Sequence, residues 1–259
     1  MVYNIRHERL DSGDQSWERR RPLYMEMVDD YRPDILAVQE ASEQQRRDVL
    51  EDNPRFAYVE PGHDHQNAVF FDRDRFVALE AGVVWISSTP KIPDSMDWDP
   101  VEPRTVYWVG LLDTERSARV WVFNTHLDYR SARSREVGME LIYERLAEIH
   151  PGDHVLVVGD FNAHIGNEIF GPLWVDPRDA ASTGPPQGPF QEAKLAIDPE
   201  SASYGTWHNW TGDADAFRID FIIASRGLRP VEATIDRRRI DGLWPSDHFP
   251  VHAVLEYRP

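Results

Sequence analysis

Apolar residues recur at helical spacing in three segments of the chain. Within residues 16–31, Leu23, Met27 and Tyr31 follow one another at intervals of four residues. This spacing places side chains on one face of a helix, which can then pack on a core. Ser16 stands before the first turn as a plausible N-cap. Two more segments are predicted as helices, residues 43–51 and 132–149.

Short apolar runs separated by turn residues predict strands in most of the remaining chain. These runs cover residues 1–6, 35–38, 56–60, 68–71, 76–79, 83–86, 106–112, 120–125, 155–158, 218–224, 231–235 and 251–257. The many strands and few helices show neither a regular alternation nor a pure β pattern. We therefore expect an α/β protein of four layers, in which two facing mixed sheets are flanked by helices.

The composition is that of a chain with a sizeable core. Of the 259 residues, 41% are hydrophobic and 11% are aromatic. Because no linker-like composition and no internal repeat divides the sequence, we interpret residues 1–259 as a single domain. An apolar run long enough to span a membrane is lacking, and no signal peptide is visible. This predicts a cytoplasmic protein, or a secreted one if an N-terminal leader is missing from the sequence.

The charge balance bears on the class of substrate. Acidic residues number 45 and basic residues 28, which gives a formal net charge of −17. Proteins that bind duplex DNA normally use clustered Lys and Arg side chains, so this balance argues against a nuclease that coats DNA. It does not exclude a small phosphate ester, because a bound metal ion can dominate the local field. Cysteine is absent, so disulfides and thiolate metal sites are excluded.

Polar residues cluster at the points where predicted buried strands end or begin. A lone polar residue after a strand is usually a turn residue, but several strand ends carrying acids, amides and imidazoles indicate a site. Carboxylate and amide oxygens suit Mg²⁺ or Mn²⁺, and histidines beside them suit proton transfer or stabilisation of phosphoryl charge. The residues in question are Glu40, His126, Asp160, Asn162, Asp247 and His248.

Six short motifs that contain these residues resemble, in their order along the chain, the motifs of the endonuclease/exonuclease/phosphatase superfamily. Each motif is weak alone, but six in the correct order with compatible spacing are a strong signal. The resemblance spans essentially the whole chain and looks closest to bacterial members of unassigned substrate. The motifs are Tyr-Asn4-Ile-Arg, Leu-Ala-Val-Gln-Glu40, Asn-Thr-His126-Leu-Asp128, Gly-Asp160-Phe-Asn162-Ala, Arg-Ile-Asp220-Phe-Ile and Ser-Asp247-His248-Phe-Pro.

The resemblance implies a metal site and a group that handles the scissile phosphate. Asn4 and Glu40 would hold Mg²⁺ or Mn²⁺, with Asp247 near or on the metal. Asp160 and Asn162 would position the attacking water and the phosphate. A metal held by carboxylates can activate water and neutralise charge that develops during hydrolysis.

The same resemblance assigns roles to two histidines. His248 would stabilise the phosphoryl oxygens, and Asp220 would form a hydrogen bond with His248 that holds its ring. The alternative for Asp220 is an ion pair with Arg218 on an exposed face. His126 would lie on the other side of the phosphate. Arg104 would bind the substrate, because its guanidinium group matches a phosphate or a carboxylate.

The chain departs from the family pattern at one position. Many relatives carry a glutamate where this chain has His65, and that glutamate would orient the histidine equivalent to His126. The replacement leaves the charge and orientation of His126 open. Asn67 or Asp64 are the candidates to substitute for it.

Several other residues permit two interpretations. His208 lies in an aromatic loop and would contact substrate or simply pack. The runs Arg19–Arg21 and Arg237–Arg239 would form phosphate-binding patches or, more simply, solvated faces. Asp128 would support the site or cap the following helix.

The function predicted from the sequence is divalent-metal-dependent hydrolysis of a small or lipid-linked phosphate ester, as a phosphodiesterase or a phosphatase. A DNA or RNA endo- or exonuclease is the alternative within the same chemistry. A non-catalytic binding module on the same fold is the alternative of a different class, and it is disfavoured because the expected catalytic positions are filled. Substrate preference would lie in loops such as residues 90–103 and 166–205.

Overall fold

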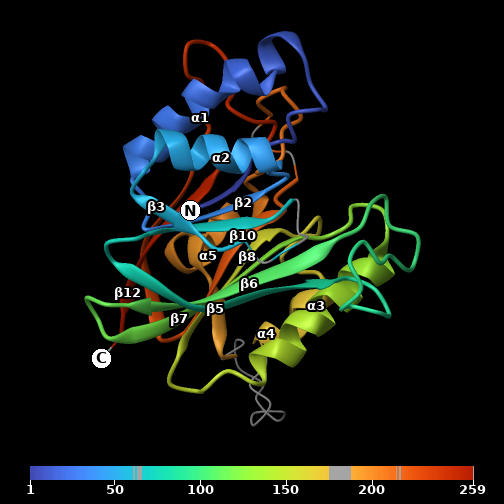
Figure 1. Ribbon diagram of the computed structural model, residues 1–259, viewed down its shortest axis with the longest axis vertical. Helices are drawn as coiled ribbons and strands as arrows, with labels where there is room; N and C mark the ends of the chain where they lie inside the picture. Colours follow the sequence, from blue (N-terminus) through green and yellow to red (C-terminus); the bar gives the residue numbers. More distant parts are fainter. Residues whose placement is uncertain (61, 63–65, 175–187, 214, 216, 259) are drawn as a thin grey trace.

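The computed structural model describes residues 1–60, 62, 66–174, 188–213, 215 and 217–258. Two six-stranded sheets lie face to face, and helices cover both outer surfaces (Figure 1). Helices α1 (Trp17–Tyr31) and α2 (Glu43–Asp52) lie on one side of the sandwich, whereas α3 (Ala132–Leu146) and α4 (Gly171–Trp174) lie on the other. This arrangement confirms the predicted four-layer α/β sandwich.

The first sheet has the strand order β11-β12-β1-β2-β4-β3. Only β1 and β2 run parallel in it, and the other neighbours are antiparallel, so the sheet is mixed. Its strands are β1 (Val2–Asn4), β2 (Ile35–Gln39), β3 (Phe56–Tyr58), β4 (Ala68–Asp72), β11 (Leu228–Ile235) and β12 (Val251–Tyr257).

The second sheet has the order β5-β6-β7-β8-β10-β9, and β7 and β8 form its parallel pair. Its strands are β5 (Phe76–Trp85), β6 (Thr105–Asp113), β7 (Ala118–His126), β8 (His154–Asp160), β9 (Phe190–Glu192) and β10 (Asp220–Ser225). The shorter helical elements are η1 (Gly13–Gln15), η2 (Glu168–Phe170), α5 (Ala193–Ile197) and η3 (Pro199–Ser203). Among the described helices, none combines the length and apolar character needed to cross a bilayer.

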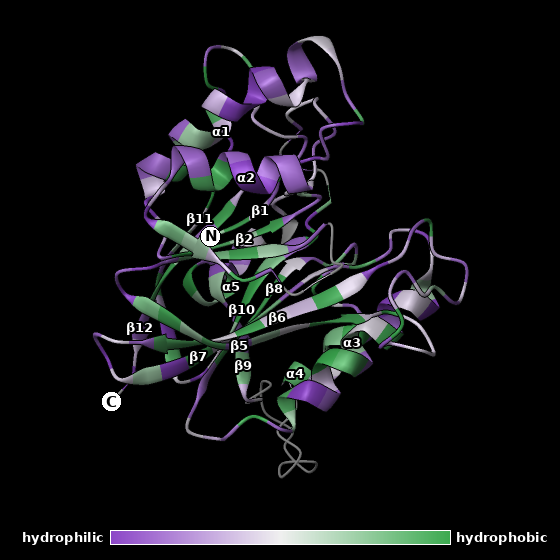
Figure 2. Cartoon of the chain, viewed as in Figure 1, coloured by the Kyte–Doolittle hydropathy of each residue, from purple (hydrophilic) through white to green (hydrophobic). Residues whose placement is uncertain are grey.

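Alternation along the central strands produces the layers. In β8, Leu156 and Val158 belong to the core between the sheets, whereas Val155 and Val157 belong to the core beneath α3. Because successive side chains of a strand point to opposite faces, one continuous apolar run fills two interfaces. Figure 2 shows the strands as largely hydrophobic and the outward-facing parts of α1 and α2 as hydrophilic.

The sequence-based strand limits needed one clear correction, in β5. Residues 76–79 and 83–86 were predicted as separate strands, but they form a single strand with a bulge between Ala78 and Glu80. Gly82 pairs with Trp108 across the β5–β6 ladder, and a Cβ at Gly82 would lie 2.5 Å from the indole ring of Trp108. The glycine therefore makes room for a cross-strand indole and does not mark a turn.

A cavity of about 590 Å³ opens between the sheets at the end from which the parallel strands start. Residues from β1, β2, β7, β8, β10 and β12 line it. No predicted site residue is among the described residues that line this cavity. The candidate site lies at the other end of the sandwich, where these parallel strands finish.

Candidate functional site

Four strands end at the same edge of the sandwich and bring the predicted residues together. In the first sheet, Asn4 of β1 pairs with Gln39 of β2, which directly precedes Glu40. In the second sheet, His126 of β7 pairs with Asp160 of β8. Asp160 pairs in turn with the first residue of the antiparallel strand β10. Because these strand ends share one edge, residues far apart in sequence converge on one place.

The backbone turns sharply directly after two of these strands. Glu40 has φ 58° and Asn162 has φ 46°, in the left-handed region that non-glycine residues seldom adopt. Such conformations cost free energy and cluster at functional sites. At Gly159, φ is 139°, and a Cβ would lie 2.0 Å from the carbonyl oxygen of Thr125. Glycine at this position lets β8 approach β7 at the height of the site.

The buried carboxylate of Asp160 lies at the centre of the cluster. Asn4 Nδ2 donates a hydrogen bond to Asp160 Oδ2 at 3.1 Å, and the backbone N–H of Asn162 donates to Oδ1 at 3.0 Å. His126 Nε2 lies 3.4 Å from Oδ2, and His248 Nε2 lies 3.8 Å from the same atom. One carboxylate oxygen thus faces two imidazole rings.

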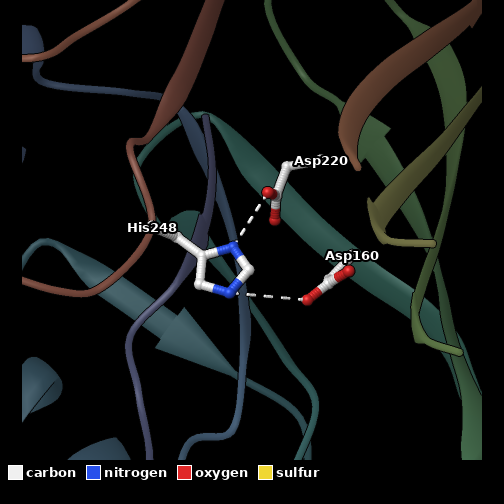
Figure 3. Close-up of side chains that lie close together, drawn as sticks. All are labelled: Asp160, Asp220 and His248. Atoms are coloured by element: carbon white, nitrogen blue, oxygen red, sulfur yellow. Dashed lines mark hydrogen bonds and ion pairs between the residues drawn. The ribbon is translucent and has the colours of Figure 1, made fainter. Parts of the chain in front are cut away.

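Asp220 and His248 form the predicted hydrogen-bonded pair, with His248 Nδ1 2.9 Å from Asp220 Oδ2 (Figure 3). Arg218, the alternative partner, bonds instead to Glu192 at 2.8 Å. Burial lowers the pKa of His248, but the charge and hydrogen bond of Asp220, together with the charges of Asp247 and Asp160, outweigh burial and raise that pKa to about 10. His248 is therefore a cation whose Nε2–H is directed at Asp160. Burial and the charge of Asp220 raise the pKa of Asp160.

His126 has a different environment from His248. Arg104 Nη1 lies 3.0 Å from His126 Nδ1, and both side chains are buried. Burial, followed by the charges of Arg104 and His248, lowers the pKa of His126 well below its ordinary value. The ring is therefore neutral at physiological pH. Arg104 was predicted to bind substrate, but in the structure its guanidinium contacts His126, and the substrate contact stays a prediction.

Carboxylate oxygens for a metal ion lie beside Asp160. Glu40 Oε1 accepts a hydrogen bond from Asn4 Nδ2 at 3.1 Å, and Glu40 Oε2 accepts one from the backbone N–H of His7 at 3.0 Å. Asp247 lies 3.4 Å from Arg6 Nη1, an ion pair that the sequence did not suggest. The set consists of oxygen donors from carboxylates and one amide, which fits a hard divalent cation.

A second grouping could also be considered for a metal. One ligand atom each from Asp160, Asp220 and His248 lie within 4.8 Å of one another. In this grouping His248 Nδ1 lies against Asp220 Oδ2, and Asp220 favours the charged form of the ring. Asp220 Oδ1 has no hydrogen-bond partner despite its burial. A bound cation would offset an excess of buried negative charge of this kind.

Arg20 corrects the interpretation of Arg19–Arg21 as a solvated face. The Arg20 side chain is fully buried, and its Nη1 donates to the carbonyl oxygens of Ile5 at 2.7 Å and Pro245 at 2.9 Å. It therefore ties the loop after β1 to the loop that carries Asp247. Helical geometry offered a signal, because three consecutive helix residues point in directions about 100° apart and cannot share one face.

Asn124 is a further residue that the sequence analysis did not single out. Its Nδ2 donates to the carbonyl oxygens of Val38 at 2.8 Å and Ala68 at 2.9 Å, and its Oδ1 accepts from Gln39 Nε2 at 2.6 Å. Asn124 lies on β7, whereas its partners lie on β2 and β4. It thus connects the two sheets immediately beneath the site, two residues before His126.

Other predicted residues serve mainly to shape the surrounding loops. His208 is buried and stacks on Phe249 with ring centroids 4.1 Å apart, which favours the packing interpretation, and its contact with substrate stays a prediction. Asp128 Oδ1 accepts hydrogen bonds from the N–H groups of Arg130 and Ser131, and so shapes the turn before α3. His65 and Asp64 lie outside the described residues. Asn67 Nδ2 donates to Thr105 Oγ1 at 3.1 Å.

Comparison with known proteins decides the family. The sequence profile of the Endonuclease/Exonuclease/phosphatase family matches residues 1–248. The chain belongs to this family. The two mixed sheets and the order of the six motifs agree with that assignment.

Solved structures of family members are similar over almost the full chain. A mannosyl-6-phosphatase of Bacteroides thetaiotaomicron is 25% identical with a TM-score of 0.81, covering 99% of this chain and 98% of that one. An endonuclease/exonuclease/phosphatase family protein of the same organism is 25% identical with a TM-score of 0.82, covering 100% of this chain and 97% of the other. Members of the family are hydrolases of phosphoester bonds.

A curated relative from Acanthamoeba polyphaga mimivirus is an uncharacterized protein that is 27% identical over 160 residues. The match covers 56% of this chain and 59% of that relative. The family assignment thus establishes a phosphoesterase fold. It does not identify the substrate, which has to be inferred from the residues of the site.

Proposed function

We propose that this protein is a divalent-metal-dependent hydrolase of phosphate esters that acts on a small or lipid-linked phosphate ester. The observation that carries the proposal is the arrangement around Asp160, whose carboxylate faces neutral His126 and cationic His248 beside the oxygen ligands of Glu40 and Asn4. A mannosyl-6-phosphatase with a similar fold supports a small phosphate ester as the class of substrate.

Glu40, Asn4 and Asp247 would hold the metal. When bound, a divalent cation supplies Lewis-acid stabilisation of phosphoryl oxygens and lowers the pKa of coordinated water. Asn4 already forms hydrogen bonds with both Glu40 and Asp160, so the metal ligands and the water-positioning carboxylate are linked within one buried network.

The remaining residues would divide the work on the phosphate. Asp160 would orient the attacking water and accept its proton, a task favoured by a carboxyl pKa that burial and Asp220 raise. His248, held as a cation by Asp220, would donate from Nε2 to an oxygen of the phosphoryl group, whose negative charge grows in the transition state. Asn162 would help to position the phosphate.

The two alternatives are weaker on specific grounds. A nuclease acting on long nucleic acid would have to hold a polyanion near a chain of net charge −17. A binding module that does not catalyse hydrolysis would not need one neutral and one cationic histidine on either side of a single carboxylate.

A hydrolysis screen tests the proposal. The panel would include p-nitrophenyl phosphate, bis-p-nitrophenyl phosphate, hexose phosphates, phospholipids and plasmid DNA, each with Mg²⁺, with Mn²⁺ and with EDTA. We expect turnover of a small or lipid-linked ester that requires metal and disappears in EDTA. A His248→Gln variant purified in the same way excludes a contaminating phosphatase. Absence of metal-dependent turnover across the panel, or turnover that His248→Gln retains in full, would overturn the proposal.

A further inference from the structure

Arg104 determines which nitrogen of His126 carries a proton. Arg104 Nη1 lies 3.0 Å from His126 Nδ1, and each side chain is only 4% exposed. A guanidinium group has hydrogen-bond donors and no acceptor, and it stays charged at any accessible pH. His126 Nδ1 must therefore accept the bond with its lone pair. A neutral ring with a lone pair on Nδ1 carries its hydrogen on Nε2.

The guanidinium of Arg104 also contacts acidic and amide side chains. Nη1 lies 3.0 Å from Glu102 Oε1 and 3.2 Å from Gln66 Oε1, and Nε lies 3.7 Å from Asp128 Oδ2. Glu102 is itself bonded to Gln66 Nε2 at 2.9 Å. Acidic and amide groups thus compensate the buried positive charge and keep Nη1 close to His126.

Comparison with His248 shows how the Arg104–His126 contact affects the protonation of the ring. His248 Nδ1 faces the carboxylate of Asp220, which favours a charged ring, whereas His126 Nδ1 faces a cation. Both Nε2 atoms approach the same oxygen of Asp160, at 3.4 Å from His126 and 3.8 Å from His248. The low pKa of His126 agrees with the geometry, since burial, Arg104 and His248 all disfavour its cation.

We propose that Arg104 is a positioning residue that fixes His126 in the neutral Nε2–H tautomer, so that His126 acts as a hydrogen-bond donor to Asp160 or to a phosphoryl oxygen and does not transfer a proton. The tautomer follows from the Arg104–His126 contact alone. Its consequence for turnover rests on the proposed function.

The tautomer is directly measurable by long-range ¹⁵N–¹H correlation NMR of the imidazole rings in the full chain without added metal or substrate. His126 is assigned by the signals that vanish in His126→Gln. We expect a pyridine-like shift at His126 Nδ1 and a pyrrole-like shift at Nε2, while His248 shows both nitrogens protonated. A protonated Nδ1 on His126 would overturn the proposal, and this outcome needs no activity and no Arg104 variant.

Variants of Arg104 separate positioning from direct binding of substrate. In Arg104→Met, we expect the His126 signals to shift to an average of both tautomers, and kcat to fall by about 10- to 100-fold while KM changes little. Arg104→Lys retains a donor and should restore the Nε2–H signature in part. Arg119→Met, an exposed arginine on the same strand as His126, is the matched control and should leave the spectrum unchanged.

The outcomes distinguish the two claims. If the tautomer is observed and no phosphate ester is hydrolysed, the proposed function fails and the tautomer assignment stands. If Arg104→Met raises KM and leaves kcat and the His126 signals unchanged, Arg104 binds substrate and the positioning role is wrong.

Discussion

At the scale of single residues, the group that faces Nδ1 decides what each site histidine can do. Asp220 faces Nδ1 of His248 and stabilises its cation, whereas Arg104 faces Nδ1 of His126 and excludes it. The two rings are therefore not interchangeable, although both direct Nε2 at Asp160. In the proposed function, His248 would supply a positive charge for the phosphoryl group and His126 would supply a neutral donor.

Replacing Asp220 with Asn tests the charged ring. The amide keeps the shape of the carboxylate but not its charge, so the pKa of His248 should fall, because burial is then opposed only by the charges of Asp247 and Asp160. His248 would lose its proton at a lower pH than in the wild type, and activity should decline earlier as pH rises. We also expect a loss of about 10- to 100-fold in kcat/KM near neutral pH. The measurement is the pH profile of kcat/KM.

The matched control for this change is Asp29→Asn, which alters an exposed carboxylate of α1. It should leave both the rate and the profile unchanged. Equal pH profiles for Asp220→Asn and the wild type would show that Asp220 does not maintain the charge of His248.

The sequence indicated site residues where acids, amides and imidazoles stand at strand ends. It did not indicate the position of a side chain that depends on how loops converge. The hydrogen bond between Asp220 and His248 was predicted and is confirmed. The direction of Arg104 was not predictable, because it depends on how Gln66 and Glu102 converge from separate loops. Such convergence leaves no local pattern in the chain.

At the scale of elements, the strands were predictable because their apolar runs fill two interfaces, as Leu156 to Val158 do in β8. The short strand β9 and helix α5 were missed, since three to five residues carry too little periodicity. Asn124 belongs to one of the six motifs, but the sequence did not indicate its role, in which its amide crosses between the sheets to Val38 and Ala68. Such a polar residue within a strand can be recognised as a link between sheets only when the position of the second sheet is known.

Asp113 at the end of β6 provides a comparable link at the opposite end of the sandwich. Its buried carboxylate accepts hydrogen bonds from Arg75 Nη2 at 2.7 Å and from Tyr257 Oη at 2.8 Å. Tyr257 ends β12 of the first sheet, so the contact joins both sheets. Burial would raise the pKa of Asp113, but the hydrogen bonds from Arg75 and Tyr257, together with the charge of Arg75 and the backbone N–H of Arg116, outweigh burial and lower it.

Asp113→Asn should therefore destabilise the protein in a pH-dependent way. A carboxyl with a lowered folded pKa stabilises the native state above its unfolded pKa of about 3.9, and this contribution is lost as pH falls through the folded pKa. We expect a cost of about 1.5 to 3 kcal/mol at neutral pH, the range for hydrogen bonds to charged groups. Urea unfolding of both proteins should show the difference shrinking toward low pH. A difference that stays constant with pH would contradict this account.

At the scale of the whole molecule, net charge sets which substrates can approach. The formal charge of −17 repels polyanions at long range, whereas a small ester is subject to the local field of the site. Binding of nucleic acid normally releases counterions and weakens steeply with salt. Because charge is a sum over residues and needs no fold, the sequence alone predicts that nucleic acid is a disfavoured partner.

Titration with duplex and single-stranded DNA tests this conclusion. We expect no shifted complex in a gel at low salt, and hydrolysis of a small ester that depends only weakly on salt concentration. A DNA complex whose affinity falls steeply with added salt would contradict the argument from charge and favour the nuclease alternative.

The central claim is that the oxygen ligands around Glu40 hold a divalent cation, and calorimetric titration of Mn²⁺ into the metal-free protein tests it most directly. The measurement compares the wild type with Glu40→Gln and with Glu26→Gln, an exposed glutamate of α1 that serves as the matched control. We expect Glu40→Gln to weaken Mn²⁺ binding by at least about 10-fold, while Glu26→Gln binds as the wild type does. Equal Mn²⁺ affinity in all three proteins would contradict this claim.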